Sequence, residues 1–227
     1  MARGKVRTDW GALPDIVPLF PLPGVLLLPR GRLPLNVFEP RYLAMTEHAL
    51  GSGRLIGMIQ PADPEASLAI NPGGPQAKVY DVGCAGRITQ FSETDDGRYL
   101  VTLTGVSRFR VAAELALAQA GYRSARVAWD AFAADRAEPE TAPIDREALL
   151  AALKAYFERR KLAANWDSVV KASDEALITA LAMACPFDPS EKQALLESPD
   201  LARRAKLLLT LFRIGAAGAG DGDVKVQ

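Results

Sequence analysis

The sequence contains one histidine, His48, and two cysteines, Cys84 and Cys185, which lie far apart along the chain. Neither cysteine has a second Cys or a His at the short spacing that zinc ligands need. A catalytic scheme built on a pair of histidines is excluded as well. We therefore expect no metal site, no redox-active cysteine pair and no cofactor.

An excess of charge of one sign and long apolar runs are also missing. The 27 basic and 27 acidic residues cancel, so the chain lacks the net positive charge of a dedicated nucleic-acid binder. No apolar run is long enough to span a bilayer, and prolines interrupt residues 11–28, where a secretion signal would need an unbroken apolar region. These absences predict a cytoplasmic protein without a membrane partner, and they argue against nucleic acid as a partner.

The common catalytic signatures are absent too. The patterns G-x-x-x-x-G-K-[ST], G-x-S-x-G, H-E-x-x-H and G-x-G-x-x-G do not occur, which excludes the usual nucleotide, hydrolase and metalloprotease motifs. We therefore expect that the protein is not an enzyme and that it has no catalytic residues.

What is present falls into two halves with different hydrophobic patterns. Up to residue 130, short runs rich in Val, Ile, Leu and Tyr are bounded by Gly, Pro or Asp, as β-strands are. After residue 144, apolar residues recur at helical spacing. We predict an α+β protein with a β-rich domain over 1–130, a linker over 131–144, a helical bundle over 145–215 and a disordered tail over 216–227. The expected strands are 16–20, 25–28, 33–38, 55–60, 79–88, 99–104, 109–113 and 122–129.

One helix is expected among the strands, from Pro40 to near Gly51, because proline suits the first turn of a helix. Its apolar residues fall on one side and His48 falls on the other. His48 is therefore expected to be a surface residue.

A hairpin turn is expected at residues 94–97, where Asp95 and Asp96 precede Gly97 between the strand runs 88–92 and 99–103. Glycine supplies the positive φ that such a turn needs, so the two aspartates are assigned to turn chemistry rather than to an acid site. Residues 62–76 show no sustained period, and we expect a surface loop there.

Four helices are expected in the second half, each with a residue suited to cap its N-terminus. Asp145 and Ser173 precede two periodic apolar segments. Asp188 and Glu191 frame a capping box at the start of the third helix. The fourth helix is expected over 198–215.

The most distinctive motifs combine closely spaced prolines, a predicted strand and a helix start. They are residues 17–25 (VPLFPLPGV), 28–29 (LP) and 33–42 (LPLNVFEPRY). Further motifs follow at 57–59 (GMI), 82–88 (VGCAGRI), 96–98 (DGR), 105–110 (GVSRFR), 191–197 (EKQALLE) and 203–204 (RR). In order and spacing, these motifs resemble the N-terminal substrate-binding domain of the Lon protease family, and the resemblance covers about residues 16–212.

This resemblance implies a fold and a function. The fold is a β-rich, PUA-like pseudobarrel with one inserted helix, followed by an α-helical bundle. The function is that of a non-catalytic, peptidase S16-like module, similar to stand-alone bacterial Lon-domain proteins, which lack the ATPase and peptidase domains. The implied partners are unfolded or extended protein segments, together with a separate protease or chaperone for which the protein would be an adaptor.

Six residues of these motifs are the candidate peptide-binding residues: Phe38, Glu39, Arg41, Tyr42, Arg108 and Phe109. Each has a structural alternative. Phe38 and Tyr42 either anchor the core beneath the turn or line a groove. Glu39 suits the positive end of the helix dipole, and Arg41 either clasps that carboxylate or contacts a ligand. Arg108 is either a buried, paired guanidinium or a ligand contact.

The sequence leaves the mode of binding and two other functions open. An apolar groove, or strand addition to an exposed sheet edge, would accommodate an extended segment. The alternative function is that of a PUA-like RNA-binding protein, against which the neutral charge and the few interleaved aromatic residues argue. A small-molecule pocket inside the barrel would need a closed cavity with convergent polar groups, and no sequence feature favours one.

Overall fold

The computed structural model describes residues 12–63, 77–137 and 141–218. The chain forms two compact units. The first comprises residues 1–138 together with 186–196, and the second comprises residues 139–185 and 197–227. A segment from the helical half of the sequence therefore belongs to the unit that contains the strands.

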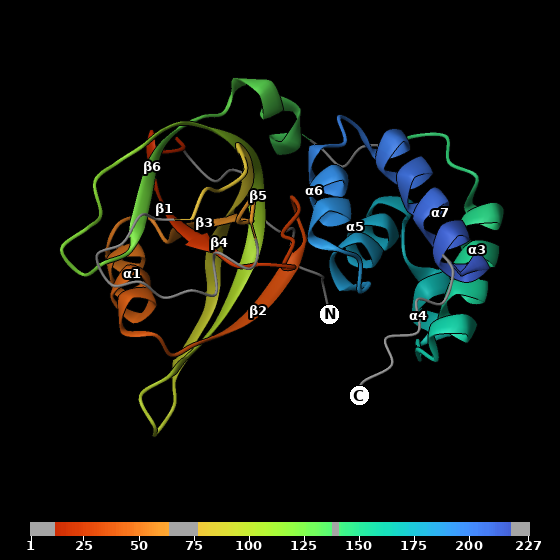
Figure 1. Cartoon of the computed structure of the whole chain (residues 1–227), viewed down its shortest axis with the longest axis horizontal. Helices are drawn as coiled ribbons and strands as arrows, with labels where there is room; N and C mark the ends of the chain where they lie inside the picture. The colour runs from red at the N-terminus through yellow and green to blue at the C-terminus, as the bar shows by residue number, and fades with distance from the viewer. Residues whose placement is uncertain (1–11, 64–76, 138–140, 219–227) are drawn as a thin grey trace, which may run out of the picture. The chain divides into compact units, whose positions relative to one another are not determined.

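Six strands form the sheet of the first unit. They are β1 (Ile16–Pro21), β2 (Arg32–Val37), β3 (Leu55–Ile59), β4 (Val82–Glu93), β5 (Tyr99–Glu114) and β6 (Arg123–Ala128). The order is β2-β5-β4-β3-β1-β6, and β5 also pairs with β6, so the sheet closes into a ring with β2 attached outside it. Only β1 and β3 pair in parallel among these strands. This is the pseudobarrel that the family resemblance implies (Figure 1).

The strand β5 is long enough to belong to two parts of the sheet. Its first residues lie between β2 and β4, and its last residues pair with β6 to close the ring. We name as the arm the three-stranded part formed by β2, residues 89–93 of β4 and residues 99–104 of β5. The β4–β5 hairpin at its end projects from the ring (Figure 1).

The core of the ring is packed around Phe109, whose side chain is fully buried. The packing requires glycine at Gly83, because a Cβ there would lie 2.5 Å from the Phe109 ring and 2.7 Å from the Met58 carbonyl oxygen. Gly105 is under the same constraint, since its Cβ would lie 2.0 Å from the carbonyl oxygen of Leu28. The run 25–28, expected to be a strand, is instead a buried non-strand segment packed against β5, so that prediction is wrong.

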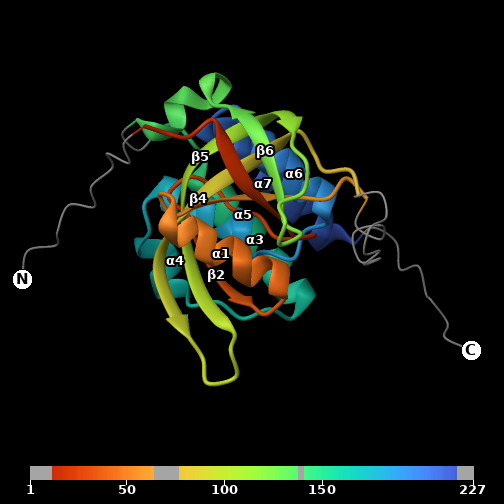
Figure 2. The same ribbon diagram turned by 90° about the vertical axis from the view of Figure 1, so that its left-hand side faces the viewer.

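The helix α1 (Pro40–Gly51) has the bounds that the sequence predicts. Its buried residues, Tyr42, Met45, Thr46 and Ala49, recur at the spacing of one helix face. His48 is exposed, as expected. Figure 2 shows α1 in front of the strands.

Two further helical segments belong to the first unit: the 3₁₀ helix η1 (Asp130–Arg136) and α6 (Pro189–Glu197). Most of η1 lies in the segment that the sequence assigns to a linker, yet Phe132 and Asp135 in it are buried. The polar side chains Lys192 and Gln193 of α6 are buried as well and bond to carbonyl groups of the strand-bearing unit. Both elements therefore pack as part of the first unit and do not serve only as connections.

The second unit contains α3 (Arg146–Arg160), α4 (Trp166–Lys171), α5 (Asp174–Ala184) and α7 (Leu201–Ala217). The expected caps are confirmed at Asp145 and Ser173, whose side chains accept from the amides three residues on. The short helix α4 is not predicted from the sequence, because none of its residues is buried and no apolar period marks it.

The last helix differs from its prediction at both ends. Asp200 caps it by accepting from the Arg203 amide, so α7 begins after Ser198. At the other end α7 continues past Gly215, whose Cβ would lie 2.5 Å from the Tyr156 ring. Gly215 thus permits a close approach of α3 and α7, and the helix ends two residues later.

Candidate functional site

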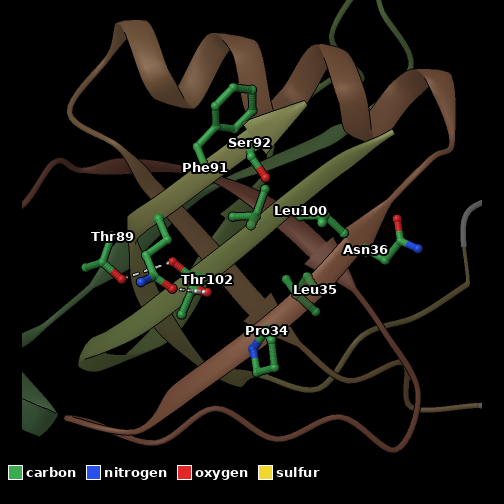
Figure 3. A pocket seen from close by; sticks show the side chains of 10 residues that line it. Pro34, Leu35, Asn36, Thr89, Phe91, Ser92, Leu100 and Thr102 are labelled. Atoms are coloured by element: carbon green, nitrogen blue, oxygen red, sulfur yellow. Dashed lines mark hydrogen bonds between the residues drawn. The ribbon is translucent and has the colours of Figure 1, made fainter. Parts of the chain in front are cut away.

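A shallow hollow of about 830 Å³ lies on the arm. Ten residues from three adjacent strands line it (Figure 3): Pro34, Leu35, Asn36, Thr89, Gln90, Phe91, Ser92, Leu100, Val101 and Thr102. None of these side chains carries a charge. The hollow therefore offers hydrogen-bonding groups and apolar surface without a fixed charge.

The strand register places two rows of side chains on one face of the arm, because residues directly opposite one another project to the same side of a sheet. Pro34, Thr102 and Gln90 form one row. Asn36, Leu100 and Ser92 form the next row. We name this surface the arm face.

Hydrogen bonds fix the first row of the arm face. The Thr102 hydroxyl donates to Gln90 Oε1 at 3.0 Å, and the Thr89 hydroxyl donates to the Thr102 carbonyl at 3.1 Å. In the second row, the side chains of Asn36 and Ser92 bond to no other residue in the described ranges. They flank Leu100, which is 46% exposed. This row combines two available polar side chains with an accessible apolar one.

The opposite face of the arm contacts α1. Phe91 packs edge-on against Tyr99 with ring centroids 5.0 Å apart, and the Tyr99 hydroxyl donates to Glu47 Oε1 at 2.7 Å. The hydrogen bond to the Glu47 carboxylate raises the pKa of Tyr99 above its ordinary value, because only the neutral phenol can donate this bond; ionisation would also place two negative charges together. Phe91 remains 42% exposed. A partner could contact its ring without any rearrangement.

The structure separates the two aromatic candidates at the start of α1. Phe38 is 62% exposed, so the expectation that it anchors the core is wrong. Tyr42 is buried, stacked on Phe20 with ring centroids 4.2 Å apart, and burial raises the pKa of its phenol. Val37 at the end of β2 is buried and Phe38 follows it, so the chain turns Phe38 outward where the strand ends.

Glu39 and Arg41 form the clasp that the sequence suggests. Arg41 donates to Glu39 Oε2 through Nε at 3.0 Å and through Nη2 at 2.8 Å. The guanidinium also lies over the ring of Tyr42, with its Cζ 4.6 Å from the centroid. Both side chains are about one-third exposed. They lie close to Phe38 in sequence and are reachable at the surface.

Arg108 and Phe109 lie inside the first unit. Arg108 pairs with Asp135 of η1, and its Nη1 donates to the Leu196 carbonyl at the end of α6 at 3.0 Å. Its Cζ lies 4.5 Å from the centre of the Phe132 ring. Phe109 fills the centre of the ring of strands. These two residues hold the site-bearing unit together rather than form its surface.

The sequence predicts strand runs at 88–92 and 99–103 around the turn, but it does not identify a binding surface there. The run expected at 79–88 and the run at 88–92 form one strand, β4, which continues to Glu93 beyond a register shift at 88–90. The signal that would have revealed the surface is the pair of apolar residues, Phe91 and Leu100, on either side of the predicted 94–97 turn.

The described part of the chain lacks two other features that would indicate a function. Within residues 12–63, 77–137 and 141–218, no three His, Cys, Asp or Glu side chains gather as a metal site would require. None of the helices described there is both long and apolar enough to cross a membrane. Most of the surface loop expected at 62–76 and most of the tail expected at 216–227 lie outside the described residues.

Comparison with protein families gives a match along most of the chain. The family described as "ATP-dependent protease La (LON) substrate-binding domain" matches residues 16–213. Lon protease 2 of Myxococcus xanthus is 29% identical over 204 residues, covering 88% of this chain and 24% of that protein. Lon protease of Anaeromyxobacter dehalogenans is 28% identical over 205 residues, covering 88% of this chain and 23% of that protein. The chain thus spans about a quarter of the length of these relatives.

Two solved structures share the fold. The Lon N-terminal domain protein from Xanthomonas campestris has a TM-score of 0.57 and 26% sequence identity, covering 86% of this chain and 97% of that one. The N-terminal domain of the Mycobacterium avium complex Lon protease has a TM-score of 0.58 and 20% identity, covering 87% and 97% respectively.

Proposed function

The chain belongs to the LON substrate-binding domain family, and from that membership we propose that it binds extended or unfolded segments of other proteins without modifying them. In this role it would be an adaptor that presents such segments to a separate protease or chaperone. The observation that carries the proposal is the arm, where the lining of an uncharged hollow includes Phe91 and Leu100, two large apolar side chains left exposed.

Exposed apolar residues support protein binding because apolar surface is released from water when a partner covers it. Folded proteins bury such side chains, whereas unfolded segments offer their own apolar side chains and unpaired backbone amides. Asn36 and Ser92 on the arm face supply hydrogen-bonding groups for those amides. The combination suits a partner chosen for its extended state rather than for one sequence.

The arm is less suited to RNA, the alternative function. Affinity for nucleic acid depends on Lys and Arg contacts to phosphate, and the hollow has no charged lining residue. RNA binding is therefore the competing outcome in the binding experiment that tests the proposal.

We assign the six candidate residues two kinds of role within this function. Phe38, with Glu39 and Arg41 beside it, would contribute contact surface, because these side chains are accessible. Tyr42, Arg108 and Phe109 would be positioning residues, because they are buried in the free protein.

The test is a titration of the full chain into a reduced, carboxymethylated protein that carries a fluorescent label, followed by anisotropy. We expect saturable binding to the wild type and about tenfold weaker binding to Leu100→Ser, as for a central apolar contact. The matched control is Leu117→Ser, because Leu117 is 45% exposed, much as Leu100 is, but lies in the β5–β6 connection. Its affinity should stay at the wild-type value.

Two outcomes contradict the proposal. If the labelled protein does not bind the wild type, the function is wrong. If a labelled single-stranded RNA binds instead, with an affinity that falls steeply as salt rises, the RNA-binding alternative replaces it.

A further inference from the structure

The pairing of β4 with its neighbour β3 ends partway along β4, which leaves the rest of that edge open. The strand β3 pairs with β4 only as far as Arg87, opposite Leu55. The last backbone bond on that side runs from the Ile88 amide to the Arg54 carbonyl at 2.8 Å. Gly53 and Arg54 both have positive φ, so the chain turns away there. In the described part of the chain, residues 89–93 of β4 pair with β5 alone.

The direction of the backbone groups in β5 follows from Gly105. Its amide donates to the Gly31 carbonyl, and its carbonyl accepts from the Arg30 amide, both at 2.8 Å. These partners lie on the β2 side. Backbone groups alternate in direction along an antiparallel strand, so Leu100 and Thr102 direct theirs toward β4. The bond from the Thr89 hydroxyl to the Thr102 carbonyl agrees with this assignment.

The pairing register between β5 and β4 also gives the direction of the backbone groups in β4. Ser92 lies opposite Leu100 and Gln90 lies opposite Thr102, so both use their backbone groups on β5. Phe91 and Glu93 then direct their N–H and C=O groups away from β5, toward the open edge. All of residues 89–93 are exposed.

The outer edge of β2 differs from the edge at residues 89–93 because it contains a proline. Since Leu33, Leu35 and Val37 lie opposite odd-numbered residues of β5, the outward residues of β2 are Arg32, Pro34 and Asn36. Proline has no N–H, so Pro34 interrupts the row of donors that an added strand would need. This edge is protected, whereas residues 89–93 contain no proline.

The open edge also has a chemical preference. Glu93 on the edge and Asp95 in the adjoining turn form no ion pair with another described residue, so their charges are available to a partner. Phe91 is 42% exposed and offers apolar surface on one side of the same edge. Phe91 and Glu93 are two residues apart and project to the same face, so a strand with an apolar side chain and a Lys or Arg two residues apart would match both features.

We propose that an extended polypeptide segment adds to the sheet as a new strand beside residues 89–93 of β4, with apolar side chains against Phe91 and a basic side chain near Glu93. The main-chain bonds to Phe91 and Glu93 supply affinity without regard to sequence. The added strand occupies the place that β3 leaves free beyond Arg54. This inference rests on the proposed function, since it names where and how the extended segment binds.

The test uses two fluorescent peptides with the same side chains. The first is a short peptide in which threonine alternates with valine or lysine, so that valine and lysine share one face, and the second has N-methyl groups on alternate residues. N-methylation removes donors along one edge of an extended peptide and blocks strand addition. We expect the first peptide to bind and the second, methylated on the edge facing β4, to show no saturable binding. Hydrogen exchange should slow at the Phe91 and Glu93 amides when the first peptide is bound.

A matched set of variants tests the same edge from the side of the protein. E93P removes an outward N–H and leaves the Ser92 bonds to β5 in place, whereas E93A keeps the N–H and removes only the charge. We expect about tenfold weaker peptide binding for E93P, the upper range for a lost hydrogen bond, and about twofold for E93A. R32P, which removes an outward N–H on the protected edge of β2 at a residue that does not line the hollow, should bind as the wild type does. Circular dichroism and the thermal midpoint establish that each variant is folded.

The outcomes separate this inference from the proposed function. If the carboxymethylated protein binds, but E93P and E93A bind equally and the amides of Phe91 and Glu93 stay unprotected, strand addition is wrong and the proposed function stands. If R32P loses binding in place of E93P, the edge is wrongly assigned. If neither the peptide nor the carboxymethylated protein binds the wild type, both proposals are wrong.

Discussion

The guanidinium of Arg108 and the carboxylate of Asp135 form a two-pronged ion pair inside the first unit. Nε lies 2.9 Å from Oδ2 and Nη2 lies 2.8 Å from Oδ1, with side chains only 5% and 8% exposed. The Arg108 amide donates to the same Oδ2 at 2.9 Å. This single pair joins β5 to η1, and Arg108 also donates to the end of α6. Three segments distant in sequence are held by one arginine.

We predict that Asp135→Ala lowers the free energy of unfolding by about 3 to 5 kcal/mol, because it leaves a buried guanidinium without its counter-charge. Denaturant unfolding, followed by fluorescence, measures the change. The control is the exposed pair of Arg98 with Asp96, whose side chains are 51% and 58% exposed. Arg98→Ala should change stability far less. Equal losses in the two variants would show that the buried pair has no special role.

The Arg108 pair also shows what the sequence can and cannot reveal. Local signals locate the ends of α1 at Pro40 and Gly51 and the caps at Asp145 and Ser173, because those signals act over one turn of helix. The partner of Arg108 lies 27 residues away, in a stretch whose composition is typical of a linker. Which distant segments meet depends on packing, and no local period encodes it.

The dependence on packing also explains the other differences between the prediction and the structure. The apolar period of α6 is that of any amphipathic helix, so it does not show whether the helix packs with strands or with helices. The run 25–28 is apolar because it is buried against Gly105, and burial without alternation resembles a core strand. For the candidate site, the sequence identified the motif that contains Phe38, but it could not show that Phe38 is exposed and Tyr42 buried.

Gly105→Ala should destabilise the protein strongly. The new Cβ would lie 2.0 Å from the Leu28 carbonyl oxygen, a backbone atom that cannot move without disturbing the segment buried on β5. We expect a loss of about 3 kcal/mol or more in the free energy of unfolding. Gly51→Ala is the matched control, because no atom lies within 4 Å of its Cβ position and its φ is not positive. That variant should be neutral or slightly stabilised. Comparable losses in both would contradict the assignment of Gly105 to a steric role.

The bond from Tyr99 to Glu47 predicts a pH dependence on the alkaline side. Because Glu47 raises the pKa of Tyr99 above 10.0, the folded state favours the neutral phenol. The stabilisation is present below the pKa of the unfolded chain and is lost as the pH rises through the higher pKa of the folded protein. NMR titration of carbon-labelled tyrosine rings measures this pKa. Glu47→Gln should lower it toward its ordinary value, whereas Glu93→Gln, a weaker influence, should lower it less.

The buried amide of Gln193 is predicted to keep α6 with the strands. Its Nε2 donates to the Val82 carbonyl at 3.1 Å, and its Oε1 accepts from Gln60 Nε2 at 3.2 Å. Gln193→Ala would leave buried polar groups without these bonds, at a cost of about 1 to 3 kcal/mol. Hydrogen exchange should then speed up across α6 before it changes in α5 or α7. Faster exchange in α5 and α7 with α6 unchanged would place α6 in the other unit.

Phe38 and Tyr42 allow binding and folding to be measured apart, because they lie four residues apart with opposite exposure. Tyr42→Ala removes a buried ring that stacks on Phe20, and we expect it to lower the free energy of unfolding by about 3 kcal/mol. Phe38→Ser removes an accessible ring, so the thermal midpoint should stay within a degree or two of the wild type, about the shift expected for a surface change. Anisotropy with the carboxymethylated protein should instead show weaker binding for Phe38→Ser. If Phe38→Ser binds as the wild type does, Phe38 is not part of the contact surface, and the surface is limited to the arm around Leu100 and Phe91. If Phe38→Ser unfolds the protein, its ring has a packing role that its exposure in the free chain does not reveal.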